Sequence, residues 1–208
     1  MVHGVCVLVR GVGPQHRREK KTEEQKEQEV PEIAFDYGYM TQEGADTFPI
    51  LVLRDSRCGY TCSSCVQAKG VNTYSVALMV GMIRDLGFRR ILLKCDNEPA
   101  TLALRAAVKD QLRDVEILDV GPPEGDHAAN TRAETAVRET KRQCRSLRLA
   151  AERKLGVKLR DDHPALAWAP RFAGHVLSTV KLGDDGRTAE LRRTGKPWKK
   201  FAIPFLRM

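Results

Sequence analysis

Apolar and polar positions follow a strand-like pattern in three consecutive stretches after Pro31. The first two, IAFDYGYM and FPILVLRD, are rich in apolar and aromatic residues and are separated by the polar, Gly-containing stretch TQEGADT. The segment RDSRCGYTCSSCV adds a third strand behind a Gly-containing turn. Short apolar runs that are bounded by turn residues are typical of β-strands, and runs joined by short turns pair in the antiparallel sense. The pattern therefore predicts an antiparallel three-stranded meander.

The spacing of apolar residues becomes helical after residue 70. In VNTYSVALMVGMIRDLG, Gly87 is expected to end a helix. The apolar face of this helix is expected to contain Tyr74, Leu78, Ile83 and Leu86. A short buried strand, FRRILLKCD, then precedes a helix, EPATLALRAAVKDQL, and a further strand, DVEILDV. Strands and helices thus alternate in the middle of the chain.

The longest predicted helix covers about residues 127–155. Its apolar stripe is formed by Ala133, Val137, Cys144, Leu147 and Ala151. A neighbouring face begins with Glu134 and continues with basic residues at steps of three and four. HPALAWAPRFAGHVLSTVKLG predicts a final helix that ends near Gly183, with Trp168 packed in the core. We expect a basic tail without a clear period over residues 186–208.

The charge of the chain points to a polyanionic partner. The net charge is +8 over 208 residues. Between positions 131 and 160, ten lysines and arginines face three acidic residues. Contacts with phosphates would give such a surface affinity for nucleic acid without sequence selectivity. The plainer interpretation of the same residues is a solvated helix face. Because the sequence has no apolar run of about 20 residues and no signal-peptide core, we expect an intracellular protein without a membrane partner.

Three acidic residues in separate elements are the candidate catalytic residues. Asp36 and Asp96 lie in or directly after apolar, strand-like runs, and Glu134 lies near the start of the long helix. Carboxylates that are held together repel one another unless a hard cation such as Mg²⁺ compensates their charge. The three acids are therefore also the candidate metal ligands. Beside a basic helix, such a site favours phosphoryl transfer on nucleic acid.

The order of these elements and acids resembles the ribonuclease H-like catalytic core of retroviral and retrotransposon integrases. In that family the second Asp commonly begins an Asp-Asn pair, seen here as Asp96-Asn97, and 37 residues separate Asp96 from Glu134 (134 − 96 − 1). Basic residues four and seven positions after the family's Glu correspond to Arg138 and Lys141. This register selects Glu134 over Glu139. The later segment GRTAELRRTGKPW is similar to the one that follows the core in copia-like elements.

The resemblance implies a fold, a reaction and partners. The fold is α/β, with a ribonuclease H-like mixed five-stranded sheet flanked by helices over residues 31–185. The reaction is metal-dependent polynucleotidyl transfer on DNA, with two Mg²⁺ or Mn²⁺ ions held by Asp36, Asp96 and Glu134. The partners are the DNA ends of a copia- or gypsy-like element and target DNA, bound by a homo-oligomer that is nuclear when active. The implied DNA-binding residues are Arg138, Lys141, Arg145 and Arg148.

The chain also departs from the family pattern. Glu98 stands where a Gly usually follows the Asp-Asn pair, and Thr131 stands where a Gly often precedes the Glu. Upstream, where integrases have a His-His-Cys-Cys zinc module, the chain offers His3, Cys6 and His16. These residues do not provide four ligands, so no zinc is expected. Residues 1–30 are interpreted as a truncated remnant of that module followed by a charged linker.

Two other functions remain open from the sequence. Cys58, Cys62 and Cys65 have the Cys-x3-Cys-x2-Cys spacing with which radical S-adenosylmethionine enzymes hold a [4Fe–4S] cluster. If residues 60–66 form a strand, however, Cys62 and Cys65 face opposite sides of the sheet and cannot share a cluster. The other alternative is a non-catalytic nucleic-acid-binding remnant of a retrotransposon polyprotein.

Overall fold

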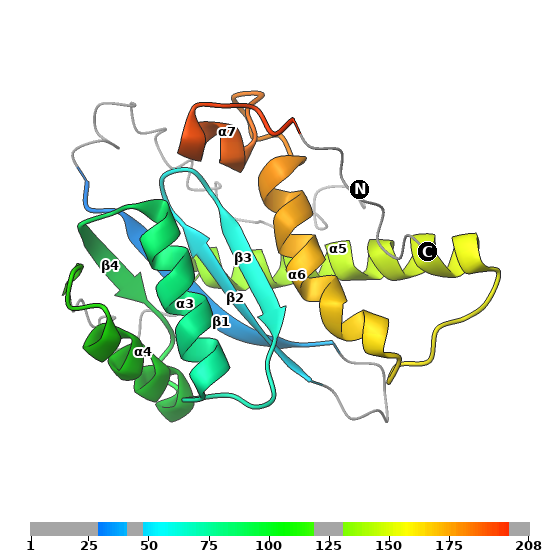
Figure 1. The fold of residues 1–208 in the computed structure, drawn as a ribbon, viewed down its shortest axis with the longest axis horizontal. Coiled ribbons are helices and arrows are strands. Elements are labelled where there is room, and N and C mark those ends of the chain that lie inside the picture. The colour runs from blue at the N-terminus through cyan, green and yellow to red at the C-terminus, as the bar shows by residue number, and fades with distance from the viewer. Residues whose placement is uncertain (1–28, 41–47, 119–130, 200–208) are drawn as a thin grey trace, which may run out of the picture.

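A mixed five-stranded sheet forms the centre of the protein (Figure 1). The computed structural model describes residues 29–40, 48–118 and 131–199. The order of the strands in the sheet is β3-β2-β1-β4-β5. The strands are β1 (Glu32–Tyr39), β2 (Pro49–Asp55), β3 (Thr61–Cys65), β4 (Arg90–Lys94) and β5 (Glu116–Leu118).

The strand pairing confirms the predicted meander. β1 pairs antiparallel with β2, where Asp36 lies opposite Val52, and β2 pairs antiparallel with β3. On its other side β1 pairs parallel with β4, and β4 pairs parallel with β5. The carboxyl ends of β1 and β4 therefore lie at the same end of the sheet.

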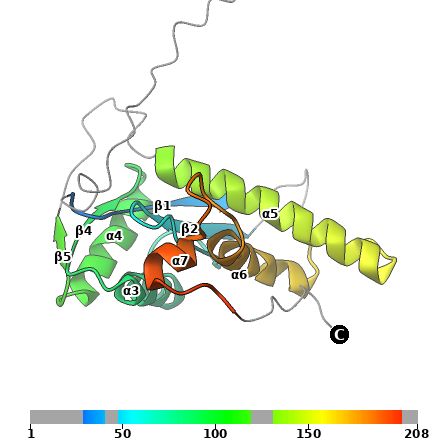
Figure 2. The ribbon, with the colours of Figure 1, turned by 90° about the horizontal axis from the view of Figure 1, so that it is seen from above.

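Helices cover both faces of the sheet (Figure 2). α3 (Thr73–Leu86) and α4 (Pro99–Gln111) pack on one face, and α5 (Thr131–Leu155) crosses the other. α6 (Pro164–Thr179) packs against the edge strand β3 and against α5, and the short α7 (Ala189–Thr194) packs against α6. This arrangement confirms the predicted α/β class, with a mixed five-stranded sheet between helices.

Most of the apolar core lies between the sheet and the helices α3 and α4. Successive residues of β1 point to opposite faces, so Ile33, Phe35 and Tyr37 enter this core. Asp36 and Gly38 consequently face α5. A Cβ atom added at Gly38 would lie only 2.6 Å from Cγ1 of Val137 on α5. The close approach of α5 to β1 thus requires a glycine two residues after Asp36.

Helix α3 confirms one prediction and corrects another. Its end at Gly87, which has the left-handed φ of 70°, is as expected, and the Asn72 side chain accepts a hydrogen bond from the Ser75 amide at its start. Tyr74, however, is 46% exposed rather than buried. It is the second residue of the helix, and its hydroxyl is 2.6 Å from that of Ser64 on the edge strand β3. This contact between hydroxyl groups, rather than the apolar spacing of the helix, accounts for where the Tyr74 side chain lies.

The C-terminal part differs from the sequence prediction in three ways. α6 ends at Thr179 rather than near Gly183. The segment expected to be a tail contains α7, which begins after the capping residue Thr188 and ends at Gly195. Trp168 is 65% exposed and is not a core residue. It lies early in α6, on a face that the neighbouring elements leave open.

Within the described residues, no helix is long and apolar enough to cross a membrane. The candidate zinc ligands His3, Cys6 and His16 lie outside the described residues.

Candidate metal and nucleic-acid site

Asp36 lies in the second half of β1 and is half-buried on the α5 side of the sheet. Its Oδ1 accepts a hydrogen bond of 2.7 Å from the Tyr37 amide. The pKa of Asp36 is raised from 3.8 to about 6, chiefly by burial and also by the negative charges of Asp96 and Glu134, against the Tyr37 amide and the ammonium of Lys69. The charge of Asp36 is therefore sensitive to both of the other candidate acids.

Asp96 lies between β4 and α4, at the end of the sheet to which β1 also points. The parallel pairing of β1 with β4 brings the Asp96 segment next to the second half of β1. The Asp96 side chain is half-buried, and its Oδ1 is 3.4 Å from the amide nitrogen of Glu98, which donates to it. Pro99, at the first position of α4, fixes where this turn ends.

Glu134 occupies the exposed first turn of α5. The start of this helix is tied to β1 by Arg132, whose Nε is 3.1 Å from Oε1 of Glu32. One turn further on, Val137 packs against Gly38. Glu134 lies between these two contacts, and its negative charge is favourable near a helix N-terminus. The contacts hold Glu134 over the part of β1 that contains Asp36.

The three acids thus gather at one end of the sheet, on its α5 side. Their carboxylate oxygens are the donor type that Mg²⁺ and Mn²⁺ prefer. Burial and, to a smaller extent, the charges of Asp96 and Glu134 raise the pKa of Asp36, and a divalent cation would favour its ionised form. In the described part of the chain, however, no three His, Cys, Asp or Glu side chains are already close enough to form a metal-binding group. The residues fit the cation chemically without being preassembled around it.

A lysine that the sequence analysis did not single out lies beside these acids. Nζ of Lys69 is 2.9 and 2.7 Å from the two carboxylate oxygens of Glu98. The ammonium also lies 5.8 and 5.4 Å from the ring centroids of Tyr37 and Tyr39. One signal for this pair was visible in the sequence, because Glu98 stands where a Gly usually follows Asp-Asn in integrases.

The predicted DNA-binding residues of α5 fall into two groups. Arg138 and Arg145 are exposed and Lys141 is half-buried, on the same helix as Glu134. Arg148 differs, because its guanidinium donates to Glu152 at 3.0 Å, to Asp161 and to a backbone carbonyl. The side chain of Arg148 thus fastens the end of α5 to the segment before α6, and its role in DNA binding stays a prediction.

Glu139 has a structural environment of its own. Its carboxylate is 2.5 Å from both the Arg54 guanidinium and the Lys181 ammonium. Burial opposes ionisation, but these two cations hold the pKa of Glu139 below its usual range. Glu139 therefore links β2, α5 and the end of α6, and it has the partners of a structural acid.

Cys58, Cys62 and Cys65 do not form a cluster site. Cys62 packs in the core beneath α3 and α4, whereas Cys65 packs on the α5 side, so the expectation that they face opposite sides of β3 is confirmed. Burial raises the pKa of each thiol to about 11. Cys58 is buried, and its Sγ donates to the Asp55 carboxylate at 2.8 Å. Protonated thiols on different faces do not provide the thiolates of an iron–sulfur cluster.

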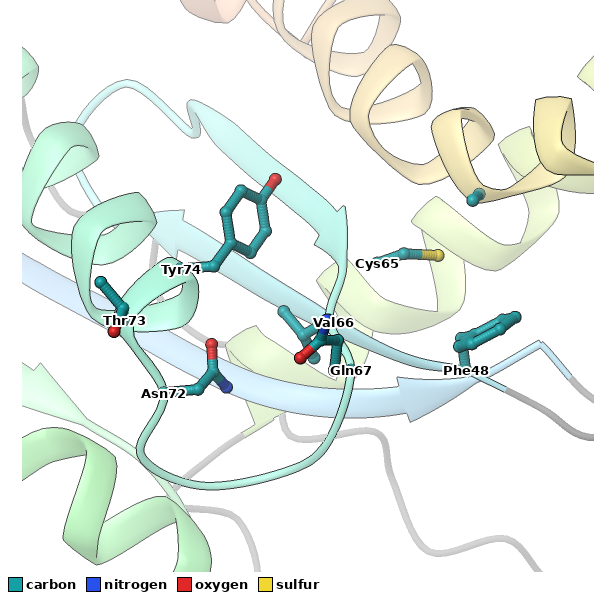
Figure 3. A pocket seen from close by; sticks show the side chains of 8 residues that line it. Phe48, Cys65, Val66, Gln67, Asn72, Thr73 and Tyr74 are labelled. Atoms are coloured by element: carbon teal, nitrogen blue, oxygen red, sulfur yellow. The ribbon is translucent and has the colours of Figure 1, made fainter.

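An open groove lies at the edge of the sheet formed by β3, next to the end of that strand (Figure 3). Its walls come from the end of β3 and the residues that follow it and from the start of α3, with Phe48 and Ala167 completing them. Tyr74 and Phe48 are prominent among the side chains that line it. The groove is lined by none of the three candidate acids, so it is distinct from the site at Asp36.

Comparison with solved structures identifies the fold. The HTLV-2 integrase catalytic core domain, solved with magnesium in a trimeric form, matches with a TM-score of 0.56 and 15% identity over 78% of this chain and 95% of that one. The BIV integrase catalytic core matches with a TM-score of 0.52 and 16% identity over 79% and 93%. A simian T-cell lymphotropic virus intasome in complex with PP2A regulatory subunit B56γ matches with 0.52 and 13% over 78% and 54%.

Sequence comparisons add nothing to these matches, since no protein-family profile and no curated protein matches the chain. At these identities the similarity concerns the fold. The chain therefore has the ribonuclease H-like fold seen in the catalytic cores of retroviral integrases.

Proposed function

We propose that this chain is the core of an integrase-type polynucleotidyl transferase that acts on DNA with divalent metal. The observation on which the proposal rests is the gathering of Asp36, Asp96 and Glu134 at one end of a ribonuclease H-like sheet, where burial and, after it, the charges of the two other acids raise the pKa of Asp36. Similarity to integrase cores, one of them solved with magnesium, supports the same reaction class.

In this proposal the three acids bind the cations. Asp36 on strand β1, Asp96 after β4 and Glu134 on α5 would hold them. Two bound Mg²⁺ ions would activate a water or a DNA 3′-hydroxyl and stabilise the leaving oxygen. Asp36 would then remain ionised at neutral pH, because bound cations favour the carboxylate form and reverse the effect of burial.

The basic residues of α5 bind the DNA backbone in this proposal. Arg138 and Lys141 lie one and two turns beyond Glu134, so a strand that reaches the acids passes them. Arg145 extends the same helix by one further turn. Such contacts provide affinity that depends on salt and is independent of base sequence.

The biological reaction would be integration of a mobile element. The site would first trim the 3′ ends of the element and then join them to target DNA in the nucleus. A copia- or gypsy-like retrotransposon is the proposed source, from the segment after the core. We also propose a homo-oligomer, supported by integrase core neighbours solved in dimeric and trimeric forms.

Direct measurement of Mn²⁺ binding tests the proposed site. The water-proton relaxation rate in a Mn²⁺ titration should show saturable binding to the wild-type chain, weakened at least about tenfold in Glu134→Gln, because an amide is a poor ligand for a hard cation. Glu139→Gln is the matched control on the same helix and should bind Mn²⁺ like the wild type. If Glu139→Gln lost binding and Glu134→Gln kept it, the assigned register of α5 would be wrong.

One observation favours a second candidate, a DNA-binding remnant without catalytic activity. The described side chains include no preassembled group of three metal-binding residues. Such a remnant would bind duplex DNA through α5 but would show no saturable Mn²⁺ binding. The same titration, combined with a DNA-binding measurement, therefore separates the two functions.

A further inference from the structure

Lys69 is fixed between the two segments that contain Asp36 and Asp96. Its ammonium forms two hydrogen bonds with the carboxylate of Glu98, two residues after Asp96. It also lies over the rings of Tyr37 and Tyr39, the first and third residues after Asp36. A lysine with both contacts has lost much of the freedom of an ordinary surface lysine.

The positive charge of Lys69 also interacts electrostatically with the candidate acids. The ammonium lowers the pKa of Asp36, against the larger opposing effect of burial. The hydrogen bonds that Lys69 donates to Glu98 are the main reason why the pKa of Lys69 is raised, and the negative charge of Asp96 raises it further. About a quarter of the Lys69 side chain remains exposed. The ammonium is therefore available to a molecule bound at the acids.

Lys69 and the basic residues of α5 approach this end of the sheet from different sides. The Tyr37 ring beneath Lys69 belongs to the core under α3 and α4, and the adjacent Gly70 amide donates to the Tyr37 hydroxyl at 3.0 Å. Arg138 and Lys141 lie on α5, across the sheet. A strand lying over the acids would thus have positive charge on both sides.

We propose that Lys69 binds a phosphate of the DNA strand at the acids, and that Glu98 holds its ammonium in position until the DNA arrives. This inference rests on the proposed DNA-binding function. Lysine suits the role because its ammonium is a point charge with three donors on a flexible chain. Glu98 is itself partly exposed, so exchanging its carboxylate for a phosphate leaves no buried charge without a partner.

Binding of a labelled DNA duplex to the full chain at several salt concentrations tests this role. Lys69→Met should weaken binding severalfold and reduce the slope of log affinity against log salt by about one unit, because one phosphate contact is lost. Lys69→Arg should restore the slope. Arg84→Met is the matched control, since it removes one positive charge from an ion pair with Asp114 near the other end of α3; it should keep the wild-type slope.

Glu98→Gln separates phosphate binding from a purely structural role of the pair. It removes a competing carboxylate but keeps Lys69, so DNA affinity should be unchanged or higher. The proposal is overturned if Glu98→Gln reproduces the loss seen in Lys69→Met, or if Lys69→Met and Arg84→Met have the same slope. Should Lys69→Met fail to fold in thermal unfolding, Lys69→Gln, which can still donate to Glu98, replaces it under the same criteria. A wild-type chain without salt-dependent DNA binding would instead defeat the proposed function.

Discussion

The two faces of the sheet are built differently. Beneath α3 and α4 the sheet contributes large, fully buried side chains such as Phe35, Leu53 and Leu93 to one extended core. On the α5 side the buried apolar contact is small and consists mainly of Ile50, Val52 and Ala136. Burial of apolar area is the main source of folding free energy, so the first face supplies most of the stability. The second face can therefore contain half-buried carboxylates that cost stability.

The sharpest test of this division is Asp96→Asn. On the proposed mechanism this substitution should lower strand-transfer activity about a thousandfold or more, since bound metal ions stabilise the charge of the transition state by several kcal/mol. The fold should persist, because an amide relieves repulsion between carboxylates. Strand-transfer assays beside thermal unfolding measure both effects. Asp110→Asn, at the exposed far end of α4, is the matched control and should retain activity.

On the face beneath α3 and α4 we expect the opposite result, a loss of stability without a loss of Mn²⁺ affinity. Leu104 is fully buried in α4, so Leu104→Ala should lower the free energy of unfolding by about 2–5 kcal/mol. Its Mn²⁺ affinity per folded molecule should stay near the wild-type value. Urea unfolding and Mn²⁺ titration at low temperature measure the two quantities. A selective loss of Mn²⁺ binding in a folded Leu104→Ala protein would contradict the division between the faces.

Gly38→Ala should affect both properties, because it acts where α5 contacts β1. The new methyl group would meet Val137 Cγ1 at 2.6 Å and push α5 outward. We expect a loss of about 1–3 kcal/mol of stability together with weaker Mn²⁺ binding through displaced Glu134. The double variant Gly38→Ala, Val137→Ala should recover much of both. Independent, additive effects of the two substitutions would argue against this contact.

Removing positive charge from α5 should change DNA binding and leave stability almost unaltered. Arg138→Ala with Lys141→Ala should reduce the salt slope of duplex binding by about two units. Exposed charges contribute little to folding, so the unfolding free energy should shift by less than about 1 kcal/mol. The control is Arg153→Ala with Lys154→Ala at the exposed far end of the same helix. Equal slopes in both double variants would assign Arg138 and Lys141 to an ordinary solvated face.

The smallest effect concerns pH. The pKa of Asp36 is raised from 3.8 to about 6 in the folded chain, so the folded state holds this proton more tightly than the unfolded state does. Without metal, the contribution of Asp36 to the unfolding free energy should therefore decrease as pH rises from about 4 to about 6. Asp36→Asn should flatten this part of the stability profile and be slightly more stable at pH 7. Denaturant unfolding with EDTA measures it; parallel profiles would refute the raised pKa.

The sequence was sufficient for most of the fold because the strands and helices have local signals. The alternation in IAFDYGYM, the cap at Gly87 and the apolar stripe of α5 depend on neighbours in the chain, and the structure agrees with them. The acids could be placed in elements, since family order and the spacing between Asp96 and Glu134 are also visible in the sequence. Their roles in catalysis stay predictions.

The features that the sequence did not predict depend on contacts between residues that are distant along the chain. Arg148 looked like one more basic residue of α5, but Asp161 and Glu152 engage it. Trp168 looked like a core residue, yet it is 65% exposed. Lys69 has no motif of its own, and its contact with Glu98 spans 29 residues. Such pairings arise only when the folded chain brings the segments together.

The alternation of side chains along β1 has a consequence for how this strand tolerates change. Ile33, Phe35 and Tyr37 are constrained by packing, whereas Asp36 and Gly38 are constrained by chemistry and by the approach of α5. A saturation scan of β1, scored separately for soluble yield and for Mn²⁺ binding, should show two interleaved profiles with a period of two residues. Yield should drop at the odd positions, and Mn²⁺ binding at position 36 should drop while yield is preserved. The stretch 33–38 would thus record both selection pressures on the protein.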